Sequence, residues 1–186
     1  KGGKLQGVVG DQQFLDAFAE VKEVERLKTA EVANLGVLTV FEQDTLEEAR
    51  HKMLDENVSR LPVRDNNGNL TGILRSTDLL KSMVPRQSQD SGGTSGRRNA
   101  GEVYMAGGGE KESMSEVPVS ELMNRMVVTS EEYLKGDKAV EMMQEQESGE
   151  IVYVNNKQPE SILTIKDLID FVKSLQPSDT VFVQLI

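Results

Sequence analysis

Short apolar runs alternate with helical patterns over residues 28–83. Residues 36–40 are rich in β-branched residues and are bounded by polar ones, so they predict a strand, and residues 60–64 and 70–74 predict two more. The last two are separated by the sequence Asp-Asn-Asn-Gly-Asn at residues 65–69. Because these residue types tolerate positive φ angles, the pattern predicts a hairpin.

Two helices complete the pattern. An apolar stripe at helical spacing begins at Leu46 and ends at Met53. Asp44 and Glu47 have the spacing of a capping box at the start of this helix. After the third strand, Ser76 is placed to cap a last helix. The predicted order of elements is therefore β-α-β-β-α.

The same unit recurs along the chain. Residues 29–66 align without a gap onto residues 119–156, and after a one-residue deletion Asp78 falls on Asp167. The chain thus holds two full copies, with a partial copy at its start.

Five segments follow from this repeat. Residues 84–116 hold seven glycines and little that could form a core, so we expect a flexible insertion, whose apolar residues 103–105 dock either on a partner or on their own domain. In chain order the segments are the trailing half of a copy with a linker helix (1–27), a full copy (28–83), the insertion (84–116), a second full copy (117–175) and the start of a further element (176–186).

Composition narrows the classes of function. The chain has 21 basic and 31 acidic residues, and its net charge of −10 disfavours direct nucleic-acid binding. It has no cysteine, and its single histidine, His51, lies on a predicted helix surface, so we expect no metal site. No run of about 18 apolar residues and no signal peptide is visible, which favours a cytoplasmic protein with no membrane contact.

Residues 58–65, 68–74 and 76–80 together resemble the CBS motif, named after cystathionine β-synthase. The likeness rests on the Leu61-Pro62-Val63 strand, the turn, the glycine-led second strand and Asp78 at the last helix. It implies an α+β fold in which tandem βαββα motifs pair as a Bateman module. It also implies two related clefts that hold adenosine-type nucleotides.

The resemblance implies a set of site residues. Asp78 and Asp167 would accept hydrogen bonds from ribose hydroxyls. Thr164 accompanies the second carboxylate, whereas Arg75 stands in the same place in the first copy and could meet a phosphate. The base would lie against apolar strand residues, namely Val37, Leu61 and Pro62 in one copy and Val127, Ile151 and Val152 in the other.

Three features argue against binding at every copy. Ser161 replaces Gly72 in the last copy and is expected to crowd its cleft. The partial copy has Gly10 and Gln13 at the two polar positions and is expected not to bind ribose. A carboxylate in the first turn of a helix is also stabilised by the helix dipole when no ligand is present.

These observations predict a non-catalytic regulatory module that binds AMP, ADP, ATP or S-adenosylmethionine and requires no cofactor. We expect a homodimer that controls an attached or partner effector domain. The alternative is a structural dimerisation scaffold that positions an attached domain, for example one associated with RNA or ribosomes. An enzyme is disfavoured, because no nucleophile is paired with a base in the sequence pattern.

Overall fold

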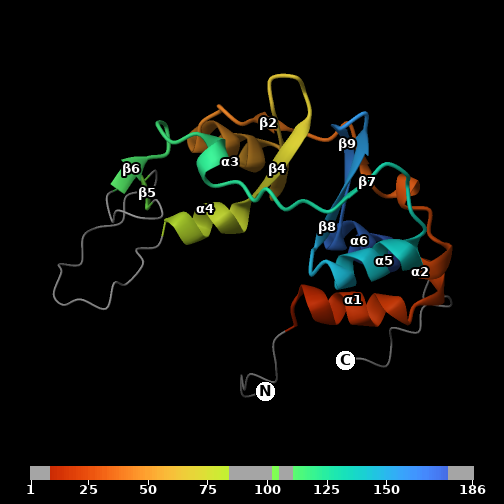
Figure 1. Cartoon of the computed structure of the whole chain (residues 1–186). Coiled ribbons are helices and arrows are strands. Elements are labelled where there is room, and N and C mark those ends of the chain that lie inside the picture. Colours follow the sequence, from red (N-terminus) through yellow and green to blue (C-terminus); the bar gives the residue numbers. More distant parts are fainter. Residues whose placement is uncertain (1–8, 84–101, 105–110, 176–186) are drawn as a thin grey trace, which may run out of the picture. The chain divides into compact units, whose positions relative to one another are not determined.

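The computed structural model describes residues 9–83, 102–104 and 111–175, which form two compact units (Figure 1). Unit 1 combines the N-terminal residues up to Gly36 with residues 128–155 and those from Glu160 onwards. Unit 2 combines residues 37–127 and 156–159. The α+β fold with tandem βαββα motifs is confirmed, since each unit has a small sheet with helices, and unit 2 has a two-stranded pair in addition.

Unit 2 is built on a three-stranded sheet in the order β2-β3-β4. The middle and last strands form the predicted antiparallel hairpin, and the first lies parallel to the middle one. Its elements are β2 (Val40–Phe41), α3 (Leu46–Asp55), β3 (Arg60–Arg64), β4 (Leu70–Arg75), α4 (Ser76–Ser82), β5 (Glu102–Tyr104), β6 (Lys111–Ser113) and the 3-10 turn η2 (Val119–Glu121).

The hairpin turn of unit 2 is held by one carboxylate. Asp65 Oδ1 accepts from the backbone N–H groups of Asn67 and Asn69, each at 2.8 Å. Hydrogen bonding by Asn69, which outweighs the cost of desolvation, lowers the pKa of Asp65. Gly68 takes a φ of +86°, a conformation that glycine adopts without steric cost. The turn chemistry predicted from residues 65–69 is therefore confirmed.

The core of unit 2 lies between its helices and one face of the sheet. Leu46 and Met53 of α3 pack with Leu61, Val63 and other apolar side chains in one buried cluster. Because strand residues alternate between faces, Leu61 and Val63 point toward this cluster and Pro62 points away from it. The apolar stripe predicted for the helix is confirmed.

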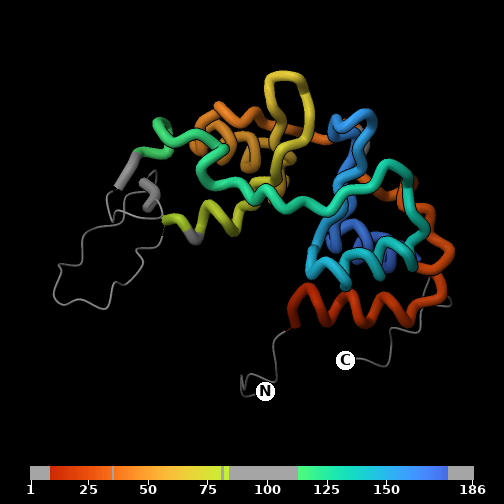
Figure 2. Tube along the Cα trace, in the orientation of Figure 1, coloured from red at the N-terminus to blue at the C-terminus, as the bar shows by residue number. Residues whose placement is uncertain are grey.

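Unit 1 contains a four-stranded sheet in the order β1-β9-β8-β7. In Figure 2, β8 and β9 form the blue hairpin, and Figure 1 shows α1 alongside α5. The elements are α1 (Asp11–Ala19), α2 (Lys22–Arg26), the 3-10 turn η1 (Thr29–Glu31), β1 (Asn34–Leu35), β7 (Thr129–Ser130), α5 (Gly136–Glu145), β8 (Glu150–Asn155), β9 (Gln158–Thr164) and α6 (Ile165–Ser174).

The N-terminal helices cover the helices of unit 1. Leu15 and Phe18 of α1 and Val24 of α2 are buried in one cluster with residues of α5, α6 and the sheet. The predicted linker helix is divided, because α1 ends at Ala19 and α2 starts at Lys22. Val21 lies in the break between the two helices, and its backbone N–H donates to the Phe18 carbonyl of α1 at 3.1 Å.

The leading segment of each copy belongs to the sheet of the other copy. Asn34, which starts the first copy, pairs with Ile162 of β9. Asn124, its equivalent in the second copy, pairs with Ile73 of β4. The predicted strand 36–40 is therefore wrong: β1 ends at Leu35, Gly36 turns with a φ of +66°, and β2 begins at Val40.

Two details of the helix starts differ from the prediction. The capping box of α3 is Thr45 with Glu48, one residue later than predicted, since the Asp44 carboxylate instead accepts from the N–H of Phe41 at 2.8 Å. Ser76 is the first helical residue of α4 rather than its cap. Where several adjacent residues have side chains that can cap a helix, contacts with the rest of the fold determine which of them does so.

The described part of segment 84–116 contains regular structure that was not predicted. β5 and β6 form an antiparallel pair, and Met114 is fully buried in the core of unit 2. The expectation of flexibility for the rest of this segment, and Met105 of its apolar cluster, fall outside the described residues. Residues 1–8 and 176–186 also fall outside them.

Candidate functional site: the polar starts of α6 and α4

The start of α6 in unit 1 brings Thr164 and Asp167 together. Asp167 Oδ2 accepts from both the backbone N–H and the hydroxyl of Thr164, each at 2.7 Å. The Thr164 hydroxyl in turn accepts from the Asp167 N–H at 3.4 Å, which completes a capping box. Both residues are half-buried. A sugar would thus meet a carboxylate that the fold already holds in place.

Asn34 is a third member of this site, and the sequence analysis missed it. Its side-chain Nδ2 donates to Asp167 Oδ1 at 3.1 Å. Asn34 lies in β1, opposite Ile162, which is two residues before Thr164. The sequence held one sign of this role, because Asn34 matches Asn124 in the internal repeat. Asn34 lies outside the motif that contains Thr164 and Asp167, so that motif alone does not reveal it.

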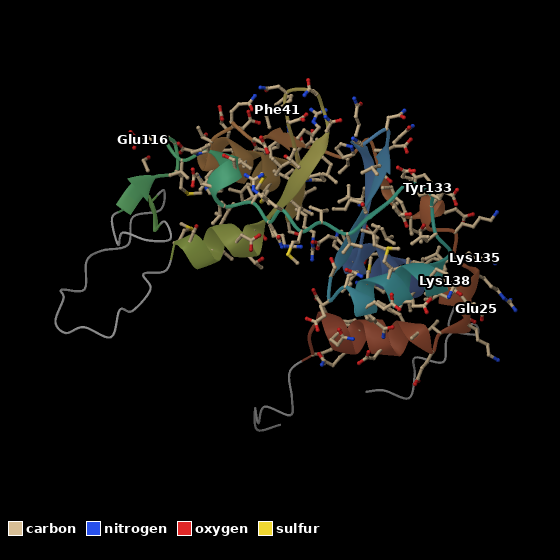
Figure 3. The ribbon with its side chains drawn as sticks, in the orientation of Figure 1. Glu25, Phe41, Glu116, Tyr133, Lys135 and Lys138 are labelled. Atoms are coloured by element: carbon tan, nitrogen blue, oxygen red, sulfur yellow. The ribbon has the colours of Figure 1, made fainter. Side chains whose placement is uncertain are left out.

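Ser161, the residue that replaces Gly72 in the second copy, has a hydrogen-bond partner inside unit 1. Its side chain is fully buried, and its hydroxyl shares a 2.9 Å hydrogen bond with the hydroxyl of Tyr133. Tyr133, labelled in Figure 3, belongs to the loop between β7 and α5 and packs against the core of unit 1. The expectation that Ser161 crowds the cleft of its copy stays a prediction.

Tyr153 is buried next to Tyr133 and extends the hydrogen-bonded cluster that Ser161 and Tyr133 begin. The rings of Tyr133 and Tyr153 lie 4.5 Å apart, and the Tyr153 hydroxyl is 2.7 Å from Thr29 Oγ1. Thr29 donates to the carbonyl of Leu134 at 2.7 Å. Burial raises the pKa of the Tyr153 phenol, although the hydrogen bond with Thr29 opposes the rise. This network ties the segment after α2 to the second copy.

The start of α4 in unit 2 has the matching backbone-to-carboxylate hydrogen bond with a different side chain beside it. Asp78 Oδ2 accepts from the N–H of Arg75 at 3.2 Å, as Asp167 accepts from Thr164. Arg75 ends β4, is half-buried and lies directly opposite Arg60 in the hairpin. In unit 1 the residue equivalent to Arg60 is Glu150, which is buried. The two copies therefore present different charges at matching positions.

The apolar residues predicted to contact a base fall into two groups. Leu61 and Ile151 are fully buried in the helix-facing cores of their units, so packing accounts for both. The others lie outside these clusters: Pro62 and Val152 are buried in strands, and Val37 and Val127 are half-buried residues outside regular structure. Val127 belongs to unit 2, whereas Ile151 and Val152 belong to unit 1.

The start of α1 repeats the cap without an acid. Gly10 N–H donates to the Gln13 side-chain oxygen at 2.9 Å, in the position that the Thr164–Asp167 bond occupies in α6. This uncharged amide offers a weaker acceptor than a carboxylate. The expectation that this copy does not bind ribose stays a prediction.

The single histidine of the chain is not part of a cluster of metal-binding side chains among the described residues. His51 is exposed, and its Nε2 lies 2.9 Å from the guanidinium of Arg50. No three histidine or carboxylate side chains among the described residues are grouped to hold a metal ion. Within residues 9–83, 102–104 and 111–175, no helix has the length and apolar content needed to span a bilayer.

The model of one protein family matches both copies. The CBS domain model aligns with residues 30–85 and again with residues 119–174. These two matches cover more than half of the chain, and they coincide with the two copies that the internal alignment defines.

Two curated relatives of similar sequence are longer than this chain. An uncharacterized protein of Methanocaldococcus jannaschii, MJ1404, is 27% identical over 98% of the chain, which spans 41% of that protein. A homoserine O-acetyltransferase of Methanococcus vannielii is 29% identical over 44% of the chain, a match that covers 16% of the enzyme. The chain thus spans less than half of the length of these relatives.

Solved structures of CBS domain pairs share the fold. The pair from MJ0100, solved in complex with 5′-methylthioadenosine and S-adenosyl-L-methionine, superposes with a TM-score of 0.58 at 18% identity, covering 78% of this chain and 98% of that one. Protein MJ1225 of Methanocaldococcus jannaschii superposes with a TM-score of 0.63 at 20% identity, covering 90% of this chain and 55% of that one.

Proposed function

The chain belongs to the CBS domain family, and we propose that it is a regulatory module that binds an adenosine-type ligand at the start of α6 in unit 1. The module is non-catalytic and requires no cofactor. Its ligand is drawn from AMP, ADP, ATP and S-adenosylmethionine. We propose further that it acts in the cytoplasm, as a homodimer, on an attached or partner effector domain.

One observation carries this proposal: the Asp167 carboxylate is fixed through Oδ2 by Thr164, while Oδ1 is turned to a single exposed amide donor. A fixed carboxylate accepts hydrogen bonds from sugar hydroxyls at little cost in ordering its own side chain. The CBS domain pair of MJ0100 binds two adenosine-type molecules, which supports this class of ligand.

We assign the first site to unit 1 rather than to unit 2 because the two copies differ beside the carboxylate. Thr164 donates its hydroxyl to Asp167, whereas the matching residue Arg75 contacts Asp78 through its backbone N–H and carries a long cationic side chain. A guanidinium beside a carboxylate competes with ribose for its oxygens and at the same time attracts phosphate. A ligand at unit 2 would therefore need a phosphate group to benefit from Arg75.

The remaining contacts to the base stay part of the proposal. In unit 1 the candidate is Val152, and in unit 2 the candidates are Pro62 and Val37. Val127, the match of Val37 in the second copy, also belongs to unit 2, and all four residues lie outside the helix-facing cores. Leu61 and Ile151 are left out, because they serve the cores.

Calorimetric titration of the purified chain tests the proposal. AMP, ATP, S-adenosylmethionine and 5′-methylthioadenosine are each added to the parent protein, and we expect binding heat with at least one of them. Asp167→Ala should weaken that binding by about 1–3 kcal/mol, because it removes a charged hydrogen-bond acceptor. The absence of heat at millimolar concentrations of all four would remove the proposal.

Asp170→Ala is the matched control. Asp170 lies in the same helix, is exposed and pairs with Lys166 and Lys173. Its removal changes the net charge by the same amount without touching the site, so affinity should not change. Equal weakening by both substitutions would show that charge alone, rather than the site, affects binding.

The second candidate function is a dimerisation scaffold that positions an attached domain, for example one that is associated with RNA or ribosomes. It is favoured by the capping bonds of Asp78 and Asp167, which give both carboxylates a structural role without any ligand. Under this alternative, Asp167→Ala lowers the free energy of unfolding, and no nucleotide raises the thermal midpoint of the parent protein.

A further inference from the structure

Asn34 contacts the Asp167 oxygen that the helix cap leaves unused. Both hydrogen bonds from Thr164 go to Oδ2, whereas Asn34 Nδ2 donates to Oδ1 at 3.1 Å. The antiparallel pairing of Asn34 with Ile162 fixes the backbone from which this amide extends. The Asn34 side chain itself is exposed and ends in a group that can rotate away.

The same oxygen is the one that a ribose needs. A carboxylate offers about four acceptor positions, of which Thr164 uses two and Asn34 a third. Two adjacent ribose hydroxyls require two acceptor positions, so one existing donor must leave. Breaking the bonds from Thr164 would uncap α6, whereas releasing the exposed amide of Asn34 leaves the backbone pairing of β1 intact.

The second copy shows that this contact is not a general requirement of the fold. Asn124 occupies the matching register position, opposite Ile73. Its side-chain Oδ1 accepts from the Met126 N–H at 2.9 Å and so stabilises its own turn. The two asparagines are therefore equivalent in the repeat but have different partners.

We infer that Asn34 is an internal competitor for the ligand: its amide occupies Asp167 Oδ1 in the ligand-free protein and is displaced by a ribose hydroxyl. This inference rests on the proposed function, because it describes how that same site is regulated. An interaction made only in the free state lowers the affinity for the ligand by the free energy of that interaction. Removing the Asn34 amide therefore strengthens binding.

Calorimetry with AMP and 5′-methylthioadenosine, on the parent chain and on Asn34→Ala and Asn124→Ala, tests this inference. The Asn34→Ala protein should bind roughly three- to tenfold more tightly, the range expected for loss of one competing hydrogen bond. Asn124→Ala is the matched control and should leave the affinity unchanged. Asn34→Ser, whose side chain is shorter, should behave like Asn34→Ala.

Thermal unfolding separates the two states of the site. Without ligand, Asn34→Ala should unfold at a lower temperature than the parent, because the bond to Asp167 is lost. At saturating ligand the two midpoints should coincide, because the parent has also lost that bond. A deficit that persists unchanged at saturation would overturn the inference, since Asn34 would then contribute equally to both states.

The outcomes distinguish this inference from the proposed function. Binding by the parent that Asn34→Ala weakens or leaves unchanged overturns the competitor role and keeps the function. Binding by the parent that Asn34→Ala strengthens supports both, since the amide then competes with the ligand in the parent. Absence of binding by the parent and by both Asn34 variants removes the function together with the inference.

Discussion

The side chain of Met123 lies directly over the α-carbon of Gly72. A Cβ atom added at Gly72 would lie 2.6 Å from Met123 Sδ and 3.0 Å from the carbonyl oxygen of Asn124. The close approach follows from the backbone pairing of Asn124 with Ile73. In unit 1, Ser161 is equivalent to Gly72 and Ala33 is equivalent to Met123. The strand residue is therefore larger in unit 1, and the residue that packs on it is smaller.

Gly72→Ala should lower the free energy of unfolding by about 1–3 kcal/mol, the usual cost of overpacking a core. Because the methionine can move and the Asn124 carbonyl cannot, only part of the strain can relax. Chemical denaturation of the single and double variants measures this. The double variant Gly72→Ala, Met123→Ala should lose less free energy of unfolding than the sum of the two single variants, because its pair of residues resembles Ser161 and Ala33 at the equivalent positions of unit 1. Strict additivity would contradict the packing argument.

The features that the sequence predicted correctly are local. The hairpin follows from the turn Asp65–Asn69, whose side chains bond to the backbone within five residues, and the inward stripe of α3 follows from helical spacing. The position of the α3 cap was wrong by one residue. Two overlapping boxes were possible, and the bond from Phe41 to Asp44 selects the later one, a contact that spacing does not reveal.

The features that the sequence did not predict depend on contacts far along the chain. Asn34 reaches Asp167 only because the first strand joins the sheet of the other copy. Ser161 is accommodated by Tyr133, which lies 28 positions away. The contact between Thr164 and Asp167 is local, because the two residues are three positions apart, whereas Leu61 and Ile151 could not be assigned to a face without the sheet and its helices.

Gly136, the first residue of α5, has no room for a side chain. A Cβ atom there would collide with the carbonyl oxygen of Val24 and lie 3.0 Å from Leu27 Cβ. Its N–H donates to the Leu27 carbonyl at 2.8 Å, which holds α2 against the helix start. The equivalent residue of the first copy is Leu46, which is fully buried. The glycine is therefore specific to the copy that receives α2.

Gly136→Ala should push α2 away from α5 and cost at least about 1–3 kcal/mol in the free energy of unfolding, because backbone atoms rather than a side-chain tip must move. Hydrogen exchange should accelerate at the amides of α2 and of Gly136. Gly10→Ala is the control, since the nearest atom to an added Cβ there is the movable side-chain oxygen of Gln13 at 3.3 Å. Unchanged exchange in α2 of Gly136→Ala would refute the close contact.

Tyr153 should make the stability of the protein depend on pH in the alkaline range. Burial raises the pKa of its phenol above the ordinary value of about 10, since the charged form is poorly solvated there. The folded state then holds the proton more tightly than the unfolded state, so the stabilisation is complete below about pH 10 and is lost as pH rises through the folded pKa.

Tyr153→Phe should lower the free energy of unfolding by about 1 kcal/mol at neutral pH, because Thr29 loses a hydrogen-bond donor. The stability of this variant should decline less steeply above pH 10. Urea unfolding at a series of pH values measures both effects, and curves of equal slope for the two proteins would exclude Tyr153 as the titrating group.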